Sequence, residues 1–237
     1  MKKKLAMVGY ANSWREAPFK DKSFEIWIMN NMYNIAPRFD RVFDIHDLDE
    51  IQSRPQKSDE PKHYETIKTL PKPIYMQDHY DEIPASVKYP LDEMIKEFYI
   101  PEAMGDKLFT TCTVTHMLAL AIYEGFEEIH LYGIDEAVDS EYVDEMPGVL
   151  YWLGVAYGKG IKIVISPNSP LLKGFWIYGY EDKPKKQHVG LLESELKRIQ
   201  DTAKVSKDYQ QVYHDEEMKC HGAEAILAHI IKLQTKI

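Results

Sequence analysis

Cysteine and long apolar runs are both scarce in this sequence of 237 residues, and each scarcity excludes a class of protein. The two cysteines, Cys112 and Cys220, form no CxxC pair, which excludes a disulfide framework and a cysteine-based zinc site. No run approaches the roughly 18 apolar residues of a membrane-spanning helix. The apolar run at residues 5–8 is too short for the core of a signal peptide. We therefore expect a cytoplasmic protein with no membrane partner.

Net positive charge and two catalytic signatures are also missing. Lys and Arg number 29 against 38 Asp and Glu, which gives a formal charge of −9. A chain with this balance has no global cationic field to hold a nucleic-acid backbone, so we expect nucleic acid only as an acceptor substrate. The absence of a Walker A loop and of a GxSxG elbow excludes P-loop phosphoryl transfer and α/β-hydrolase chemistry.

Six short apolar runs, each followed by polar residues or glycine, have the composition of buried strands in a parallel sheet. They cover residues 5–8, 25–29, 41–45, 73–76, 128–132 and 162–165. Segments with helical periodicity lie between them, above all residues 113–124, which end at Gly125, and residues 149–157. This alternation predicts an α/β fold with a doubly wound, mostly parallel, Rossmann-like sheet.

The sequence changes character near its C-terminal end. Residues 191–237 contain no Pro, and their charged and apolar residues alternate at helical spacing. We predict a Rossmann-like nucleotide-binding domain at residues 1–182 and a C-terminal helical arm at residues 183–237. The arm has two open interpretations, an oligomerisation arm or lid that makes the protein a homo-oligomer, and solvated helices packed on their own domain.

Polar residues follow every predicted strand. Because the carboxyl ends of parallel strands meet at one edge of a sheet, residues 9–13, 30–31, 46–47, 77–79, 133–136 and 166–169 are expected to be neighbours. Any one of these turns is also explained by ordinary turn composition, but six together are typical of a ligand cleft. The residues expected to bind a nucleotide or its phosphate are Gly9, Ser13, Arg15, Asn30, Thr110, Thr111, Thr113, Gly133, Asn168 and Ser169.

Two of these segments suggest phosphate sites at helix starts. Ser13 with Glu16 has the pattern of a capping box, which predicts a helix beginning beside the first strand, where Arg15 adds positive charge. The hydroxyl-rich residues 110–113 directly precede the helix predicted at 113–124. Capping of that helix by one Thr explains the second segment equally well.

Three residues are candidates for acid–base chemistry. His46 and Asp47 lie at a strand end and are typical of a base with the carboxylate that orients it, or of two metal ligands. Asp135 follows Gly133, and a carboxylate there orients a hydroxyl, binds a metal, takes a proton or simply caps the turn. The nine His residues show no metal-ligand spacing, so no metal site is predicted.

Several motifs resemble a known family. The closest likenesses are Gly133-Ile134-Asp135 after a strand, Pro167-Asn168-Ser169 followed by Leu171-Leu172, Asn30 with Tyr33, and Gly9 with Ser13. Over residues 4–180 the sequence resembles bacterial sialyltransferases that use CMP-sialic acid, archaeal-type 6-hydroxymethyl-dihydropterin pyrophosphokinases, and uncharacterised tailed-phage proteins. The resemblance implies that these positions hold a cytidine nucleotide and its phosphate. It also implies a phage origin and hence the host cytoplasm.

Three functions remain open. The first is a glycosyltransferase that uses a nucleotide or nucleotide sugar as its donor substrate, with His46, Asp47 and Asp135 as candidate bases. The second is a Mg²⁺-dependent nucleotidyl or pyrophosphoryl transferase, in which Asp78 and Asp135 hold the metal. The third is a non-catalytic protein that binds and sequesters a nucleotide.

Overall fold

The computed structural model describes residues 3–53, 62–135, 142–174, 177–181 and 207. The chain divides into two compact units, Met1–Lys173 and Gly174–Ile237. Nearly all of the second unit, including the predicted helical arm, lies outside the described residues. The architecture that follows is therefore that of the first unit.

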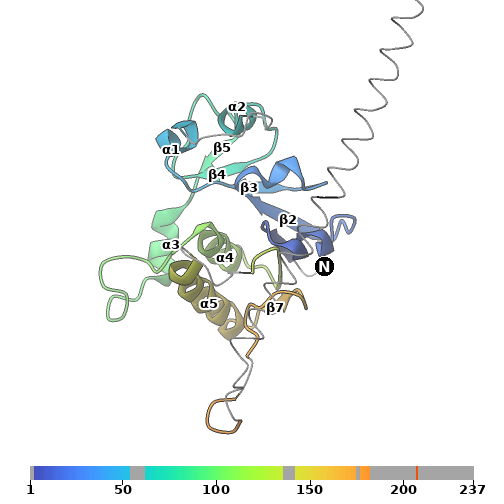
Figure 1. Ribbon diagram of the computed structural model, residues 1–237. Coiled ribbons are helices and arrows are strands. Elements are labelled where there is room, and N and C mark those ends of the chain that lie inside the picture. Colours follow the sequence, from blue (N-terminus) through green and yellow to red (C-terminus); the bar gives the residue numbers. More distant parts are fainter. Residues whose placement is uncertain (1–2, 54–61, 136–141, 175–176, 182–206, 208–237) are drawn as a thin grey trace, which may run out of the picture. The chain divides into compact units, whose positions relative to one another are not determined.

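Seven parallel strands form one sheet, which confirms the predicted α/β class with a Rossmann-like sheet (Figure 1). Their order across the sheet is β5-β4-β3-β2-β1-β6-β7. The strands are β1 (Lys4–Val8), β2 (Phe24–Met29), β3 (Arg41–Phe43), β4 (Ile74–Met76), β5 (Ser86–Lys88), β6 (Glu128–Tyr132) and β7 (Lys162–Ile165).

The strand order reverses direction between β1 and β6. From β1 the chain builds outward through β2, β3, β4 and β5, and then returns to place β6 on the other side of β1. Lys4 pairs with Phe24 of β2 on one side and with Glu128 of β6 on the other. In open parallel sheets ligands bind outside the carboxyl ends of the strands at such a switch point, so the topology itself marks this position.

The six strands predicted from the sequence are all present at about the expected positions, but a seventh, β5, was not predicted. Strand β5 has three residues, of which Val87 and Lys88 are exposed, because it lies at the edge of the sheet. So short and so exposed a strand lacks the apolar run that identifies buried strands. Strand β3 is also shorter than predicted, ending at Phe43 instead of residue 45.

Helices connect the strands on both faces of the sheet, and none in the described part of the chain is long and apolar enough to cross a bilayer. The α-helices are α1 (Leu48–Ser53), α2 (His63–Ile67), α3 (Leu91–Phe98), α4 (Thr113–Tyr123) and α5 (Tyr142–Gly158), and the 3-10 helices are η1 (Asn12–Glu16) and η2 (Asn30–Asn34). Figure 1 shows α4 and α5 side by side and away from α1 and α2.

The two helices predicted from the sequence correspond to α4 and α5. Gly125 ends α4 as predicted: its φ is 72°, and the Phe126 N–H donates to the Ala121 carbonyl. Helix α5 begins before residue 149, where the sequence prediction placed its start.

Two hydrophobic cores cover the two faces of the sheet. Side chains of alternate residues point to opposite faces, so Leu5 and Met7 of β1 join the core under α3, α4 and α5, whereas Ala6 and Val8 join the other. The second core contains Met32 of η2 together with Ile51 of α1 and Ile67 of α2. Burial on both faces is what a parallel sheet with crossover helices requires.

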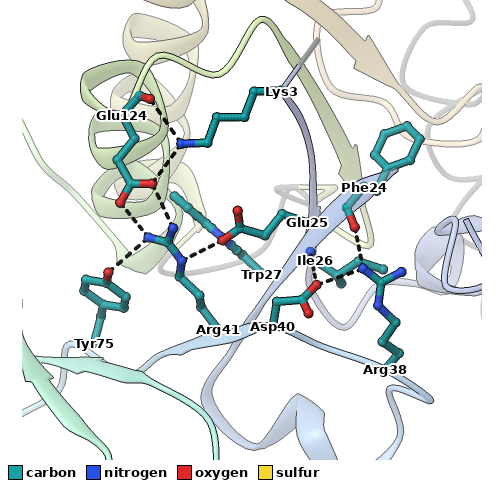
Figure 2. A network of polar contacts seen from close by, with 10 residues as sticks. All are labelled: Lys3, Phe24, Glu25, Ile26, Trp27, Arg38, Asp40, Arg41, Tyr75 and Glu124. Atoms are coloured by element: carbon teal, nitrogen blue, oxygen red, sulfur yellow. Dashed lines mark hydrogen bonds and ion pairs between the residues drawn. The ribbon is translucent and has the colours of Figure 1, made fainter. Parts of the chain in front are cut away.

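A network of ion pairs holds the amino ends of the strands (Figure 2). Arg41 Nε lies 2.6 Å from a carboxylate oxygen of Glu25, and its two terminal nitrogens lie 2.5 and 2.9 Å from those of Glu124. Lys3 Nζ donates to the Glu124 carbonyl at 3.1 Å, and the Arg41 guanidinium lies over the Trp27 ring. Since Glu124 follows α4, this network joins that helix to the sheet. It lies at the end of the strands opposite to the switch-point loops.

Candidate functional site

The loops that follow β1 and β6 meet backbone to backbone at the switch point. The Gly9 N–H donates to the Tyr132 carbonyl at 2.9 Å, and the Ala11 N–H donates to the Gly133 carbonyl at 3.0 Å. A Cβ on Gly9 would lie 2.5 Å from the Gly133 carbonyl oxygen, and a Cβ on Gly133 would collide with the Gly9 carbonyl. Gly133 also has a φ of 65°. Both positions therefore require glycine, which accounts for two of the predicted site residues.

Ser13 lies at this junction, but the predicted capping box is wrong. The segment folds as the five-residue 3-10 helix η1, which begins at Asn12 and has no side-chain cap. Ser13 is buried, and its Oγ accepts a hydrogen bond of 2.7 Å from the Gly133 N–H. Ser13 thus fixes the loop after β6, and η1 is too short to supply the helix N-terminus expected for a phosphate.

Glu16 extends the junction to the loop after β7 instead of completing a capping box. Its carboxylate accepts hydrogen bonds of 2.7 Å from Ser166 Oγ and from Asn168 Nδ2. Ser169 Oγ donates to the Ile134 carbonyl at 3.3 Å. The prediction that the residues after these strands are neighbours is confirmed for the loops after β1, β6 and β7. Asn168 and Ser169 belong to this cluster.

Asn30, directly after β2, has two unusual properties. Its φ is 49°, one of two positive values among the described residues other than glycine. Its side-chain oxygen Oδ1 is buried and has no hydrogen-bond partner within the described part of the chain. A buried acceptor without a donor costs about 1–3 kcal/mol. Next to it, the Tyr10 hydroxyl donates to the carboxamide oxygen of Asn31, which joins the loops after β1 and β2.

The hydroxyl-rich segment before α4 is held by its own contacts. The N-cap residue of α4 is Cys112, not Thr110, Thr111 or Thr113. Thr115, in the first turn, completes a capping box: its Oγ1 accepts hydrogen bonds from the N–H groups of Thr111 and Cys112 at 3.1 and 3.2 Å. Thr111 Oγ1 donates to the Glu145 carbonyl of α5 at 2.8 Å. Because α4 leads into the amino end of β6, its N-terminus lies toward the carboxyl ends of the strands.

A buried carboxylate with two imidazoles lies at the carboxyl end of β3. Asp44 is fully buried, and its two oxygens lie 2.6 Å from His46 Nδ1 and 2.6 Å from His63 Nε2. The carboxylate that orients His46 is therefore Asp44. Asp47, expected in that role, instead accepts a hydrogen bond of 2.8 Å from the Asp49 N–H at the start of α1.

His63 continues this chain to η2. Its Nδ1 lies 2.6 Å from the Tyr33 hydroxyl, and its side chain is 7% exposed against 30% for His46. Burial acts to raise the pKa of Asp44, but the hydrogen bonds from His46 and His63 outweigh it and hold the pKa at about 2. Burial raises the pKa of Tyr33 above its usual range. Asp44 is thus held in its ionised form, whereas the Tyr33 hydroxyl stays protonated.

Asp135, Arg15 and Asp78 are the remaining candidates. Asp135 follows β6 and is partly buried. Arg15 is exposed, with its guanidinium over the Trp14 ring at 4.9 Å. Asp78, after β4, is exposed and lies 3.5 Å from Lys88 Nζ. No group of three or more His, Cys, Asp and Glu side chains in the described ranges is arranged to hold a metal ion.

Sequence reasoning missed Asp44 and His63. Asp44 was placed inside a strand predicted to run to residue 45, and His63 lies 19 residues away with no motif to connect them. Tyr33 was identified only as part of the Asn30 and Tyr33 motif that resembles the sialyltransferase family. A signal was present in the Asp-x-His spacing of Asp44 and His46, which puts two residues just past the strand end on one side.

Comparisons with known proteins give similarities among solved structures alone: no family model and no curated protein matches the chain. The chain is similar to the sialyltransferase CstII from Campylobacter jejuni in complex with the substrate analogue CMP-3FNeuAc, with 19% identity and a TM-score of 0.46 over 71% of this chain and 82% of that one. It is likewise similar to the sialyltransferase CST-II in complex with a trisaccharide acceptor and CMP, with 19% identity and a TM-score of 0.46 over 74% and 89% of the two chains. Both similarities are distant.

Proposed function

We propose that this protein is a glycosyltransferase that binds a nucleotide sugar at the carboxyl ends of β1, β2 and β6. The observation that carries the proposal is the switch point, where Gly9 and Gly133 bring two loops together and Asn30 holds a buried carboxamide oxygen in need of a donor. A ligand with N–H or O–H groups, such as a base or a ribose, supplies that donor.

The chemistry of the surrounding side chains favours a nucleotide. Asn168 places its carboxamide at this edge, where the buried Ser13, Ser166 and Ser169 fix the loops through their own hydrogen bonds. Helix α4, with eleven residues, begins toward that edge and presents N–H groups to an anion. The sequence resemblance to sialyltransferases that use CMP-sialic acid agrees with this choice and makes cytidine nucleotides the first probes.

Transfer requires a leaving phosphate and a base for the acceptor hydroxyl. Asp135 at the end of β6 and His46 at the end of β3 both lie at the carboxyl edge, on either side of β1 and β2. The acceptor proposed is the hydroxyl group of a glycan, of a modified nucleotide or of a DNA base, in keeping with the predicted phage origin and cytoplasmic location.

The test is a thermal-shift screen of the full chain against CMP, UMP, GMP, AMP, their diphosphates, CMP-N-acetylneuraminic acid and UDP-glucose, with and without Mg²⁺. A ligand at a hundred times its Kd adds about 2.7 kcal/mol of stability. We expect a cytidine nucleotide to bind without Mg²⁺. Binding that needs Mg²⁺ would favour nucleotidyl transfer, binding without any turnover would favour a sequestering protein, and no shift with any probe would refute the proposal.

Asn30→Gly provides the matched variant, because glycine keeps the positive φ and removes only the carboxamide. Leu172→Gly is the control, since Leu172 is the other described residue with a positive φ that is not glycine, at 59°. We expect Asn30→Gly to weaken nucleotide binding roughly tenfold, in line with the loss of one hydrogen bond. Leu172→Gly should leave the affinity unchanged.

A further inference from the structure

The five histidines in the described part of the chain differ in what their ring nitrogens contact. Both nitrogens of His63 and of His130 lie 2.6–3.1 Å from polar atoms. His46 and His79 each hold a polar atom at Nδ1, at 2.6 and 2.8 Å. The His116 ring makes no hydrogen bond within the described residues, and its Nδ1 is buried. His116 is therefore the imidazole whose polar groups the fold leaves unpaired.

His116 lies in the first turn of α4, at the carboxyl edge of the sheet. Its carbonyl accepts a hydrogen bond of 2.9 Å from the hydroxyl of Tyr89, the residue that directly follows β5. The Tyr89 ring meets the imidazole edge-on, with ring centroids 4.8 Å apart at an angle of 86°. Since the Cα–Cβ bonds of a helix tilt toward its N-terminus, the His116 side chain leans toward the same edge. Tyr89 thus holds both the backbone and the ring of His116 in place.

The His116 ring is neutral and has uncharged surroundings. Burial lowers the pKa of His116 to about 4, and no charged group among the described residues contributes to this shift. The positive end of α4 also disfavours an imidazolium in the first turn. A neutral imidazole has one N–H donor and one lone pair. Because an anion bound to this ring would meet no cation beside it, an uncharged polar group suits the position better.

The exposure of the two ring nitrogens places the proton. Nδ1 is the buried nitrogen of a residue that is only partly buried, so Nε2 is on the outward side of the ring. A buried N–H without an acceptor is rarer in proteins than a buried lone pair without a donor. The proton of neutral His116 therefore lies on Nε2, and Nε2–H is the group that donates to a ligand. The bare Nδ1 lone pair remains a cost to the free protein.

The proposed function supplies an uncharged acceptor of this kind near the start of α4. The helix begins at Thr113, and His116 follows three residues later, about 4.5 Å along the helix axis. A phosphate at the N-terminus of α4 brings with it the sugar to which it is bonded, and the acceptor sugar has to approach that same sugar. A sugar hydroxyl carries no charge, and its oxygen accepts a hydrogen bond from an N–H group.

We propose that His116 is a sugar-binding residue whose Nε2–H donates to a hydroxyl oxygen of the donor sugar or of the acceptor sugar. This inference rests on the proposed function and adds to it a sugar subsite at the first turn of α4. Tyr89 is a positioning residue, because it contacts the ring and the carbonyl of His116. The unpaired imidazole lowers the stability of the free protein and is retained for the ligand.

The first experiment measures the Tm of the full chain without any ligand. His116→Phe keeps an aromatic ring against Tyr89 and removes the unpaired nitrogen, so we expect the Tm to rise by about 2–4 °C. His63→Phe is the matched control: it removes a hydrogen-bonded partner of the buried Asp44, and its Tm should fall. A Tm of His116→Phe at or below that of the wild type would show that the imidazole is satisfied within the protein, and would overturn the inference.

The second experiment places the proton. In the full chain labelled with ¹⁵N at histidine, NMR at pH 7 distinguishes the two neutral tautomers, and His116→Phe assigns the signals. We expect neutral His116 to carry its proton on Nε2. His116 protonated on Nδ1, or present as an imidazolium at pH 7, would contradict the inference even if no ligand has been found.

The third experiment compares Kd values by calorimetry for CMP, CMP-N-acetylneuraminic acid, UDP, UDP-glucose, and lactose in the presence of CMP. If His116 binds the donor sugar, His116→Phe should weaken the nucleotide sugar about tenfold and leave the nucleotide and lactose unchanged. If it binds the acceptor sugar, only lactose should bind more weakly. Equal Kd values of the variant and the wild type for every probe that the wild type binds would overturn the inference. A wild type that binds no nucleotide would refute the proposed function, whereas the Tm and NMR results would still decide whether His116 is unpaired.

Discussion

The two ends of β3 carry two polar networks with opposite character. Arg41 begins the strand and pairs with Glu25 and Glu124, all groups with permanent charges at neutral pH (Figure 2). Asp44 follows the last residue of the same strand and pairs with His46 and His63, whose charge depends on a proton. Two residues, Val42 and Phe43, separate the network of fixed charges from the one whose imidazoles are charged only when protonated.

The comparison separates interactions that hold the fold from interactions suited to chemistry. At the amino edge the positive charges of Arg41 and Lys3 face the negative charges of Glu25 and Glu124, so the group is neutral as it stands. At the carboxyl edge one buried carboxylate contacts two imidazoles, each of which is charged only when it is protonated. In a parallel sheet this division follows from topology, because the loops that vary in sequence lie at the carboxyl edge.

The largest effect on the unfolding free energy is expected at Gly133, and Gly125 at the opposite edge of the sheet serves for comparison. Gly133→Ala puts a methyl group against the Gly9 carbonyl and forces a φ of 65° on alanine, so we expect a loss of about 4 kcal/mol of unfolding free energy. Gly125 at the amino edge has a φ of 72° and nothing within 4 Å of an added Cβ. Gly125→Ala should cost only about 1 kcal/mol. Urea denaturation of both variants measures the difference, and equal losses would show that close approach at the switch point is unimportant.

Removal of the central cation tests the amino edge. Arg41→Met leaves Glu25 and Glu124, which are 27% and 21% exposed, without their main partner, and should lower the unfolding free energy by about 3 kcal/mol. Arg41→Lys keeps the charge but loses the bidentate contact, so its loss should be smaller. Nucleotide affinity should be unchanged in any variant that folds. A change in affinity without a change in stability would contradict the division between the two edges.

The sequence predicts the strands and the glycines at their ends, but it does not predict the long-range hydrogen bonds that join the loops. The buried strands and the glycines at the ends of β1 and β6 follow from apolar runs and their breakers. The Ser13–Glu16 pattern predicted a capped helix, but local pattern cannot show that Ser13 and Glu16 make their hydrogen bonds to Gly133 and Ser166, 120 and 150 residues away. Tertiary contacts overrode the local signal.

Of the cluster at the end of β3, which comprises Asp44, His46 and His63, only His46 was predicted from the sequence. His46 was recognised because it follows a strand, but its partner was taken to be the adjacent Asp47. The end of β3 at Phe43, two residues earlier than predicted, is what turns Asp44 from a strand residue into the centre of the site. Such boundary errors of one or two residues are ordinary, and here one decides which carboxylate contacts His46.

The pH dependence of stability tests the carboxyl edge. The pKa of Asp44 falls from 3.8 in the unfolded chain to about 2 in the folded protein, so its contribution to stability is complete above about pH 5 and is lost as pH falls toward 2. The shift corresponds to about 2 kcal/mol. Asp44→Asn should remove this part of the acid destabilisation in denaturation curves taken from pH 5 to pH 2. Asp78→Asn is the control, because the Asp78 pKa is also lowered, chiefly by the His79 N–H, but its carboxylate is exposed; an equal effect of both variants would contradict the special role of Asp44.

The smallest effect is expected where an ion pair belongs to neither edge network. Lys159 Nζ lies 3.3 Å from Glu97 Oε1, but the two side chains are 48% and 47% exposed, against 18% and 21% for Arg41 and Glu124. Water and salt screen an exposed pair, so Glu97→Gln should change the unfolding free energy by at most about 0.5 kcal/mol. The substitution keeps the size of the side chain and leaves Lys159 over the Phe98 ring. The difference measured by denaturation should be smaller in 0.5 M than in 0.05 M salt. A loss comparable to that of Arg41→Met would show that burial does not separate the two kinds of pair.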